Sequence, residues 1–257
     1  MESNLVEAFG FLERLPGVEV HRQVDLVWFA TGIPHPQFNG VVRTQLATGD
    51  VDTRIDDVIS HFESRGLPMV WLSGPLTRPA DLGERLEAHG LRHAGESIGM
   101  SVRLETLDGS LLRAQEIVIK RVRDDETLRS YLHAFTLGSD FPVVVAEGLF
   151  DLFSTLGFEE NLPWRHYAGF KDGEPVASAS IFLGREAAGV FDVATVSSAR
   201  GQGIGTAMTL RALLDARDAG HRLGVLTSST MGLGVYKRLG FEEFGRIGRY
   251  VWVGGRT

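Results

Sequence analysis

Hydrophobic residues in the first part of the chain follow helical spacing in some segments and strand spacing in others. Leu5, Phe9, Leu12 and Leu15 recur every three or four residues, which predicts an amphipathic helix over Ser3–Leu15. The same spacing predicts helices at Asp52–Arg65 and Pro79–His89, and short apolar runs predict strands at Val18–Arg22, Leu26–Ala30, Val41–Leu46, Met69–Leu72 and Ile98–Leu104. We therefore expect a mixture of helices and strands in this half.

A second series of elements begins after the interruption Leu107–Ser110. Asp172-Gly173 between two alternating runs is a strong hairpin signal, and a glycine-rich loop follows the third strand of this series. The pattern predicts strands at Ile117–Val122, Trp164–Lys171, Pro175–Leu183, Ala188–Val196 and Leu223–Leu226, helices from Asp124 and over Val143–Leu156, Thr206–Ala219 and Gly232–Leu239, and a hairpin strand region at Phe241–Val253.

The two series suggest a chain of two domains. In both halves a helix, a strand, a second helix, a glycine with an apolar residue and a further strand follow in the same order. We expect a first domain at residues 1–108, a linker at 109–116 and a second domain at 117–257. Only the second half carries a glycine-rich loop before its first helix of this order, so the first domain would be a degenerate copy. An unrelated α+β cap is the alternative.

Composition narrows the class of protein. Of 257 residues, 43% are hydrophobic and 23% charged, and the net charge is -7 with Lys and Arg scattered, so we expect no nucleic-acid partner. The absence of cysteine excludes disulfides, cysteine-ligated metals and a cysteine nucleophile, and no metal is expected. The N-terminus does not resemble a secretory signal, and no apolar run approaches the roughly 20 residues of a membrane span. These features predict a cytoplasmic protein without a membrane partner.

The loop from Arg200 to Thr206 is the strongest chemical signal. The first N–H groups of a helix have no intrahelical partners, and glycines before them remove the side chains that would keep an anion away. Arg200 would add positive charge or order the turn. No Gly-Lys-Ser/Thr follows, and the preceding strands form a hairpin rather than a βαβ unit, so the loop fits neither ATP nor a dinucleotide. The residues alone also allow a tight turn that only packs a helix onto a sheet.

Two stretches together resemble the GNAT superfamily of N-acetyltransferases. Phe191–Thr206 resembles its acetyl-CoA signature, and Val235–Phe241 resembles its closing motif, a tyrosine followed by Gly-Phe. The resemblance covers roughly residues 117–253. It implies an α+β fold for this half, with a central mixed β-sheet flanked by helices. If the first half is a degenerate copy, the chain contains two GNAT-like domains of this kind.

The resemblance also implies roles for particular residues. Tyr236 would protonate the departing thiolate, and Ser229, where the family often has asparagine, would contact the cofactor. Main-chain groups of Val193, Ala194 and Thr195 would bind the pantetheine arm, and the pyrophosphate would bind at Arg200, Gly201, Gln202, Gly203, Ile204, Gly205 and Thr206.

The implied activity is transfer of an acetyl group from acetyl-CoA, as co-substrate, to a primary amine of a small molecule, amino acid or peptide in a ternary complex. A base must deprotonate the amine, and Asp192, Glu147, Asp151 and His166 are candidates beside a water-relayed path. Phe141, Leu149, Phe150 and Phe153 line either an acceptor site or a helix core. The alternatives are a non-catalytic acyl-CoA sensor and a transferase for another acyl group. Both a monomer and a homodimer agree with the sequence.

Overall fold

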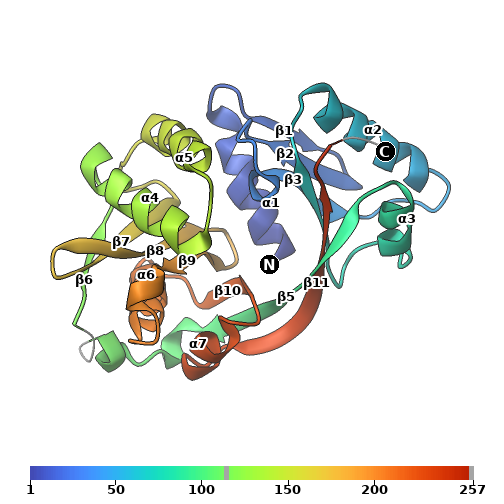
Figure 1. Cartoon of the computed structure of the whole chain (residues 1–257). Helices are drawn as coiled ribbons and strands as arrows, with labels where there is room; N and C mark the ends of the chain where they lie inside the picture. Colours follow the sequence, from blue (N-terminus) through green and yellow to red (C-terminus); the bar gives the residue numbers. More distant parts are fainter. Residues whose placement is uncertain (113–115, 255–257) are drawn as a thin grey trace. The chain divides into compact units, whose positions relative to one another are not determined.

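The computed structural model describes residues 1–112 and 116–254, and Figure 1 shows the course of the chain. It divides into two compact units. Among the described residues, the C-terminal unit comprises Gly99–Phe244 with Met1, and the N-terminal unit comprises Glu2–Ile98 with residues 245–254. The last stretch of the chain therefore belongs to the unit that is otherwise built from the first hundred residues.

The N-terminal unit contains a mixed sheet with the strand order β1-β2-β3-β4-β11. Strands β1, β2 and β3 are antiparallel neighbours, β3 and β4 run parallel, and the end of β11 pairs antiparallel with β4. The elements are α1 (Glu2–Phe11), β1 (Glu19–Arg22), β2 (Leu26–Ala30), β3 (Asn39–Thr44), α2 (Val51–Ser64), β4 (Met69–Ser73), α3 (Leu82–Ala88) and β11 (Glu242–Trp252).

Helices cover both faces of this sheet, in agreement with β2, which is apolar at every position. Alternate side chains of a strand point to opposite faces. Leu26 and Trp28 accordingly enter the cluster built with α2 and α3, whereas Val27 and Phe29 pack against Leu5, Val6 and Phe9 of α1. The sheet thus lies between α1 on one side and α2 with α3 on the other.

The C-terminal unit has the strand order β5-β10-β9-β8-β7-β6. Strands β6 to β9 form an antiparallel series, and β10 runs parallel to β9. The elements are β5 (Arg92–Arg103, of which Gly99–Arg103 belong here), β6 (Val118–Arg121), α4 (Asp125–Ser139), α5 (Val143–Leu156), β7 (Trp164–Lys171), β8 (Glu174–Leu183), β9 (Ala188–Thr195), α6 (Ile204–Asp218), β10 (Leu223–Ser228) and α7 (Leu233–Arg238).

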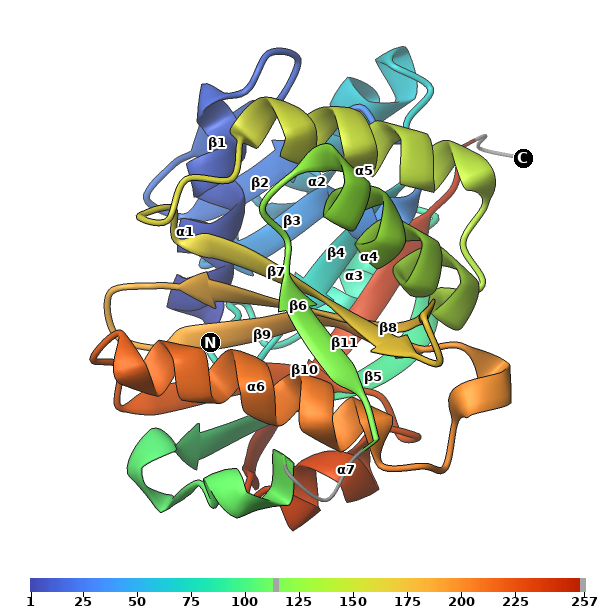
Figure 2. The ribbon, with the colours of Figure 1, turned by 90° about the vertical axis from the view of Figure 1, so that its left-hand side faces the viewer.

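Two neighbouring residues of β7 show which helix covers which face. The His166 side chain contacts Ser180, which in turn contacts Tyr131 of α4. The Tyr167 hydroxyl instead donates to Asp215 of α6 at 2.8 Å. Adjacent strand residues point in opposite directions. Helices α4 and α6 therefore cover opposite faces, and Figure 2 shows α5 beside α4 and α6 beside β9.

Most predicted elements are confirmed, and β2, α5 and β7 have the predicted bounds. The predicted hairpin at Phe241–Val253 is wrong, because these residues form the one long strand β11. The expected linker 109–116 begins as a short 3-10 helix (Gly109–Leu112), and residues 113–115 lie outside the described residues. The domain boundaries at 108 and 117 stay a prediction.

The two halves share an order of elements. The series α2, β4, α3, β5 in the first half matches α6, β10, α7, β11 in the second. Each first helix also follows a strand that runs parallel to the first strand of the series, β3 beside β4 and β9 beside β10. This correspondence allows positions in the two units to be compared directly.

Candidate active site

The start of α6 is an open helix terminus. Gly203 is the residue before the helix, with φ 77° and ψ 0°, and no side chain caps the terminus. Ala207 is the first residue whose N–H forms a helical hydrogen bond. It donates to the carbonyl of Gly203 at 3.1 Å. The N–H groups of Ile204, Gly205 and Thr206 precede this bond, so they are placed to bind an anion.

Glycine is required in this loop for its backbone conformation. Gly201 and Gly203 both have φ 77°, in the left-handed region that L side chains rarely adopt. A Cβ on Gly201 would meet nothing within 4 Å, so its surroundings are open. The predicted cradle for a pyrophosphate therefore agrees with the shape of this loop.

Arg200 orders the loop. Its Nε donates to the carbonyl of Thr195 at 3.0 Å, and its Nη2 donates to the carbonyl of Gly138 at the end of α4, also at 3.0 Å. Gly138 lies so close to β9 that an added Cβ would be 2.9 Å from the Cβ of Ala194. Of the two roles expected for Arg200, the structure shows the ordering of the turn.

Strand β9 is irregular where the cofactor arm is expected. Phe191 and Ala194 face Ser180 and Ser178 of β8, so Asp192 and Val193 together oppose a single β8 residue. This β-bulge places Asp192 at φ 53° and takes its backbone out of the regular ladder.

The opposite edge of β9 is paired with β10 only near its start. The register joins Ala188 and Gly189 to Gly224 and Val225 and does not extend to the predicted pantetheine residues. Val193, Ala194 and Thr195 thus lie where β9 and β10 have separated. An extended ligand could add to this strand edge.

Tyr236 lies on α7 and is 8% exposed. Burial alone raises the pKa of its hydroxyl to about 12, so it stays protonated at physiological pH. Its ring packs edge-on against Phe241, with ring centroids 5.7 Å apart.

Ser229 is exposed and shapes the turn before α7. Its hydroxyl accepts a hydrogen bond from the N–H of Gly232 at 3.2 Å, and its carbonyl accepts from the Ser228 hydroxyl at 2.7 Å. A cofactor contact through Ser229 stays a prediction.

A chain of buried polar side chains ends at Asp192. The hydroxyl of Tyr131 donates to its carboxylate at 3.0 Å and lies 2.7 Å from the Ser180 hydroxyl, which in turn lies 2.8 Å from Nδ1 of His166. Burial raises the pKa of Asp192 to about 6 against the lowering effect of the Tyr131 and Ser180 hydrogen bonds. Burial, aided by the charge of Arg121, lowers the pKa of His166 to about 3, so this imidazole is neutral.

The other candidate bases occupy a different place. Glu147 and Asp151 lie on the outer side of α5 and line a groove of about 480 Å³ between α4 and α5. Phe141 and Phe150 line the same groove, whereas Leu149 and Phe153 are buried in the core. The apolar cluster expected from the sequence is thus divided between a groove and the core.

The comparison with protein families is decisive for the C-terminal unit, since residues 135–241 match the model of the acetyltransferase (GNAT) family. Residues 135–241 belong to the GNAT family. The matched region includes β9, the glycine loop, α6 and Tyr236. A search of curated proteins finds no match.

Solved structures extend the GNAT fold over nearly the whole chain. A GCN5-related N-acetyltransferase from Kribbella flavida superposes with a TM-score of 0.70 at 17% identity, covering 98% of this chain and 96% of that one. A tandem GNAT protein from the clavulanic acid biosynthesis pathway gives 0.61 at 13% identity, covering 99% and 89%. A functionally unknown conserved protein from Staphylococcus epidermidis gives 0.66 at 13% identity, covering 92% and 94%. These likenesses show the α+β fold with its mixed sheet and flanking helices.

Two members of the polar chain were not foreseen from the sequence. Tyr131 lies in a helix and Ser180 in a strand, and neither belongs to a motif. The one signal in the sequence is the hydroxyl of Ser180 between the apolar residues Ala179 and Ile181. No helix within residues 1–112 and 116–254 combines the length and apolar character that crossing a membrane requires.

Proposed function

We propose that this protein transfers an acetyl group from acetyl-CoA to a primary amine of a small molecule, amino acid or peptide. The observation that carries the proposal is the open terminus of α6, with left-handed Gly201 and Gly203, beside the unpaired edge of β9. The GNAT match of the same residues supports acetyl-CoA as the donor. The α6 loop and the edge of β9 fit this cosubstrate, because free main-chain N–H groups can bind its pyrophosphate and an unpaired strand edge can pair with its amide-bearing arm.

Proton transfer divides between two residues in this proposal. Asp192 takes a proton from the ammonium group, and the freed amine nitrogen bonds to the carbonyl carbon of the thioester. As the carbon–sulfur bond breaks, Tyr236 gives its proton to the sulfur. A carboxylate with a pKa of about 6 is largely ionised at neutral pH yet basic enough to accept a proton.

Asp192 is preferred over the other candidate bases for its position. It lies in the bulge of β9, directly before the predicted pantetheine residues, whereas Glu147 and Asp151 lie on the outer side of α5. His166 is 6% exposed and its Nδ1 contacts Ser180. Tyr131 and Ser180 are positioning residues, because they act on the reaction through Asp192.

The N-terminal unit is proposed to be a GNAT-like copy that does not bind CoA. Gly40 of β3 and Ala188 of β9 hold the same place in the two parallel strand pairs. Counted from these two residues, the end of β3 corresponds to the predicted pantetheine residues of β9. There the carbonyl of Thr44 accepts from the N–H of Arg78 at 3.0 Å, and the N–H of Leu46 donates to the carbonyl of Arg78 at 3.1 Å. The chain itself thus occupies the strand edge that is unpaired in the C-terminal unit.

The catalytic tyrosine also has no counterpart in the N-terminal unit. Phe241 donates its N–H to the carbonyl of Tyr236 at 3.0 Å, and Leu91 makes the same bond to Leu86 at 3.0 Å. The residue that corresponds to Tyr236 is therefore Leu86, which is fully buried and has no hydroxyl.

A panel of amines incubated with acetyl-CoA tests the function. Release of free thiol that depends on one amine, together with an acetylated product by mass spectrometry, is the expected result. CoA binding without turnover on any amine would favour the acyl-CoA sensor instead. Turnover only with longer or acidic acyl donors would favour a different acyl group, because the α6 loop would contact only the CoA part.

A further inference from the structure

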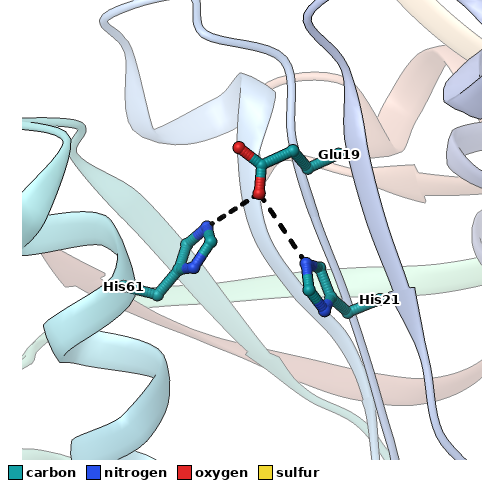
Figure 3. A group of neighbouring side chains, drawn as sticks. All are labelled: Glu19, His21 and His61. Atoms are coloured by element: carbon teal, nitrogen blue, oxygen red, sulfur yellow. Dashed lines mark ion pairs between the residues drawn. The ribbon is translucent and has the colours of Figure 1, made fainter.

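A carboxylate and two imidazoles meet at the edge of the N-terminal unit's sheet. Glu19 and His21 are two residues apart on β1, so they point to the same face. His61 lies on α2, which covers that face. Figure 3 shows the three side chains directed at one another.

Their geometry is close to that of ligands around one ion. Nε2 of His61 is 3.2 Å and Nε2 of His21 is 3.7 Å from the same oxygen, Oε2 of Glu19. All three ligand atoms lie within 4.8 Å of one another. Ligands of a tetrahedral zinc ion with bonds of about 2.1 Å are about 3.4 Å apart, so small side-chain rotations complete the arrangement.

Hydrogen bonding does not account for this convergence. Within the described residues, Nε2 of His61 is buried and makes no hydrogen bond, even though Oε2 of Glu19 is 3.2 Å away. The distance of 3.7 Å from His21 to the same oxygen is too long for a hydrogen bond. Both nitrogens therefore face the carboxylate at ion-pair distance, and neither forms a hydrogen bond to it.

Both rings are held in place by Trp28. The imidazole of His21 stacks on the indole with ring centroids 3.7 Å apart and planes 10° apart, and His61 packs against it at 4.3 Å. Trp28 is itself 8% exposed and faces His21 in the β1–β2 register. The rings are thus ordered before any ion arrives, while His21 and Glu19 leave the cluster accessible to solvent.

We propose that Glu19, His21 and His61 bind a divalent transition-metal ion of the Zn²⁺ type. Two imidazole nitrogens and one carboxylate oxygen are ligands typical of zinc and similar ions, whereas Mg²⁺ and Ca²⁺ prefer oxygen alone. The protein supplies three ligands, and water completes the coordination. A bound ion would join the edge strand β1 to α2.

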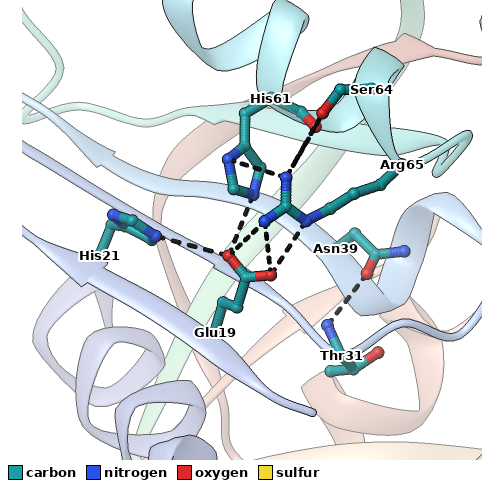
Figure 4. Close-up of polar contacts among 7 residues, drawn as sticks. All are labelled: Glu19, His21, Thr31, Asn39, His61, Ser64 and Arg65. Atoms are coloured by element: carbon teal, nitrogen blue, oxygen red, sulfur yellow. Dashed lines mark hydrogen bonds and ion pairs between the residues drawn. The ribbon is translucent and has the colours of Figure 1, made fainter.

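Arg65 positions the carboxylate in this site. Its Nε donates to Oε1 of Glu19 at 2.9 Å, and its Nη2 also reaches Oε2 at 3.1 Å, as Figure 4 shows. A carboxylate that binds a metal is commonly held by a second hydrogen-bonded partner. Glu19 can contact Arg65 and a metal ion at the same time, since each carboxylate oxygen accepts more than one contact.

Titration of the untagged full chain with Co²⁺ tests the proposal directly. We expect one Co²⁺ per chain with visible absorption bands, displacement by Zn²⁺ and a higher melting temperature with Zn²⁺. His21→Gln and His61→Gln each remove one imidazole and keep a polar side chain of similar length. Either change should weaken Co²⁺ binding by about 100-fold, since loss of even a supporting residue costs about 10- to 100-fold.

His89→Gln is the matched control. His89 is a histidine of the same unit that also contacts carboxylates, with Nδ1 2.9 Å from Asp56 and Nε2 3.2 Å from Asp52. This variant should bind Co²⁺ like the unchanged protein. The proposal is overturned if the chain binds no Co²⁺ stoichiometrically, or if all three variants weaken binding equally. Neither readout uses acetyl transfer, so the metal site and the proposed function fail independently.

Discussion

At the scale of single residues, the candidate site depends on groups whose surroundings change their acidity. Tyr236 and Asp192 are both shifted by burial, and in both the shift favours the neutral form. For Tyr236 this keeps a proton donor protonated. For Asp192 it brings the pKa of the carboxyl group close to physiological pH.

Tyr236→Phe should lower kcat by about 100-fold, because the departing sulfur loses its proton donor. The affinity for CoA, measured by calorimetry, should stay within about twofold, since the α6 loop is unchanged. Tyr167→Phe is the control, because it removes a tyrosine hydroxyl that bonds to Asp215 in the same unit. That variant should lose about 1 kcal/mol of stability and retain its turnover. Equal kcat values for the two variants would contradict the role of Tyr236.

Asp192 should impose an inflection on the pH–rate profile. The base acts when deprotonated, so kcat/KM should rise with pH through about 6. Tyr131→Phe removes a hydrogen bond that lowers the pKa of Asp192, so the inflection should move to higher pH. A merely structural role of Tyr131 would reduce activity at all pH values and leave the inflection where it was.

The same carboxylate should reduce stability at neutral pH. Because its pKa is raised on folding from 3.8 to about 6, its contribution is fully favourable below the lower value and is lost as pH rises through the higher one. Asp192→Asn should therefore be more stable at pH 7 by roughly 1–3 kcal/mol, while its turnover falls. Urea denaturation at pH 4 and pH 7 measures this, and a gain that is equal at both values would refute the assignment.

At the scale of elements, the loop before α6 combines local chemistry with a particular backbone. Its glycines were recognisable in the sequence, because left-handed residues before a helix are a short-range feature. The bulge in β9 was not, because it depends on the register with β8. The end of the chain was misassigned as a hairpin for a similar reason, since β11 pairs with β4 rather than with a neighbour in sequence.

Gly203→Ala should weaken acetyl-CoA binding more than it weakens folding. The added Cβ is strained at φ 77° and stands at the mouth of the anion cradle, so KM for acetyl-CoA should rise about tenfold or more. Gly220→Ala is the control, because Gly220 follows the other end of α6 with φ 94° and open surroundings. Both variants should lose about 1 kcal/mol of stability, and only the first should change KM. Similar KM values would mean that the loop does not contact the donor.

At the scale of the whole molecule, the compact units do not follow the linear order of the chain. Residues 245–254 belong to the N-terminal unit, and Gly99–Arg103 of β5 belong to the C-terminal unit. Leu104 continues from this strand and donates its N–H to the carbonyl of Arg222 at 2.9 Å. A cut placed at the expected linker would therefore separate strands that belong together.

Fragments of the chain should fold according to these units. Residues 99–244 should form a stable fragment, because they contain the C-terminal unit apart from Met1. Residues 111–257 should not, because they lack β5 and expose the edge of β10. Circular dichroism and thermal unfolding of the two fragments would decide, and a stable 111–257 fragment beside an unfolded 99–244 fragment would contradict the division.

The sequence by itself determined the features that act over short distances. Hydrophobic spacing defined most helices and strands, and the glycine loop with Tyr236 marked the GNAT domain, because each of these signals lies within one turn or one neighbouring element. Tertiary structure alone decided the path of β11, the polar chain from Asp192 to His166, the pairing of Arg78 with the end of β3, and the meeting of Glu19, His21 and His61. These contacts join residues that are far apart in the chain, and only strand order and register determine which of them meet.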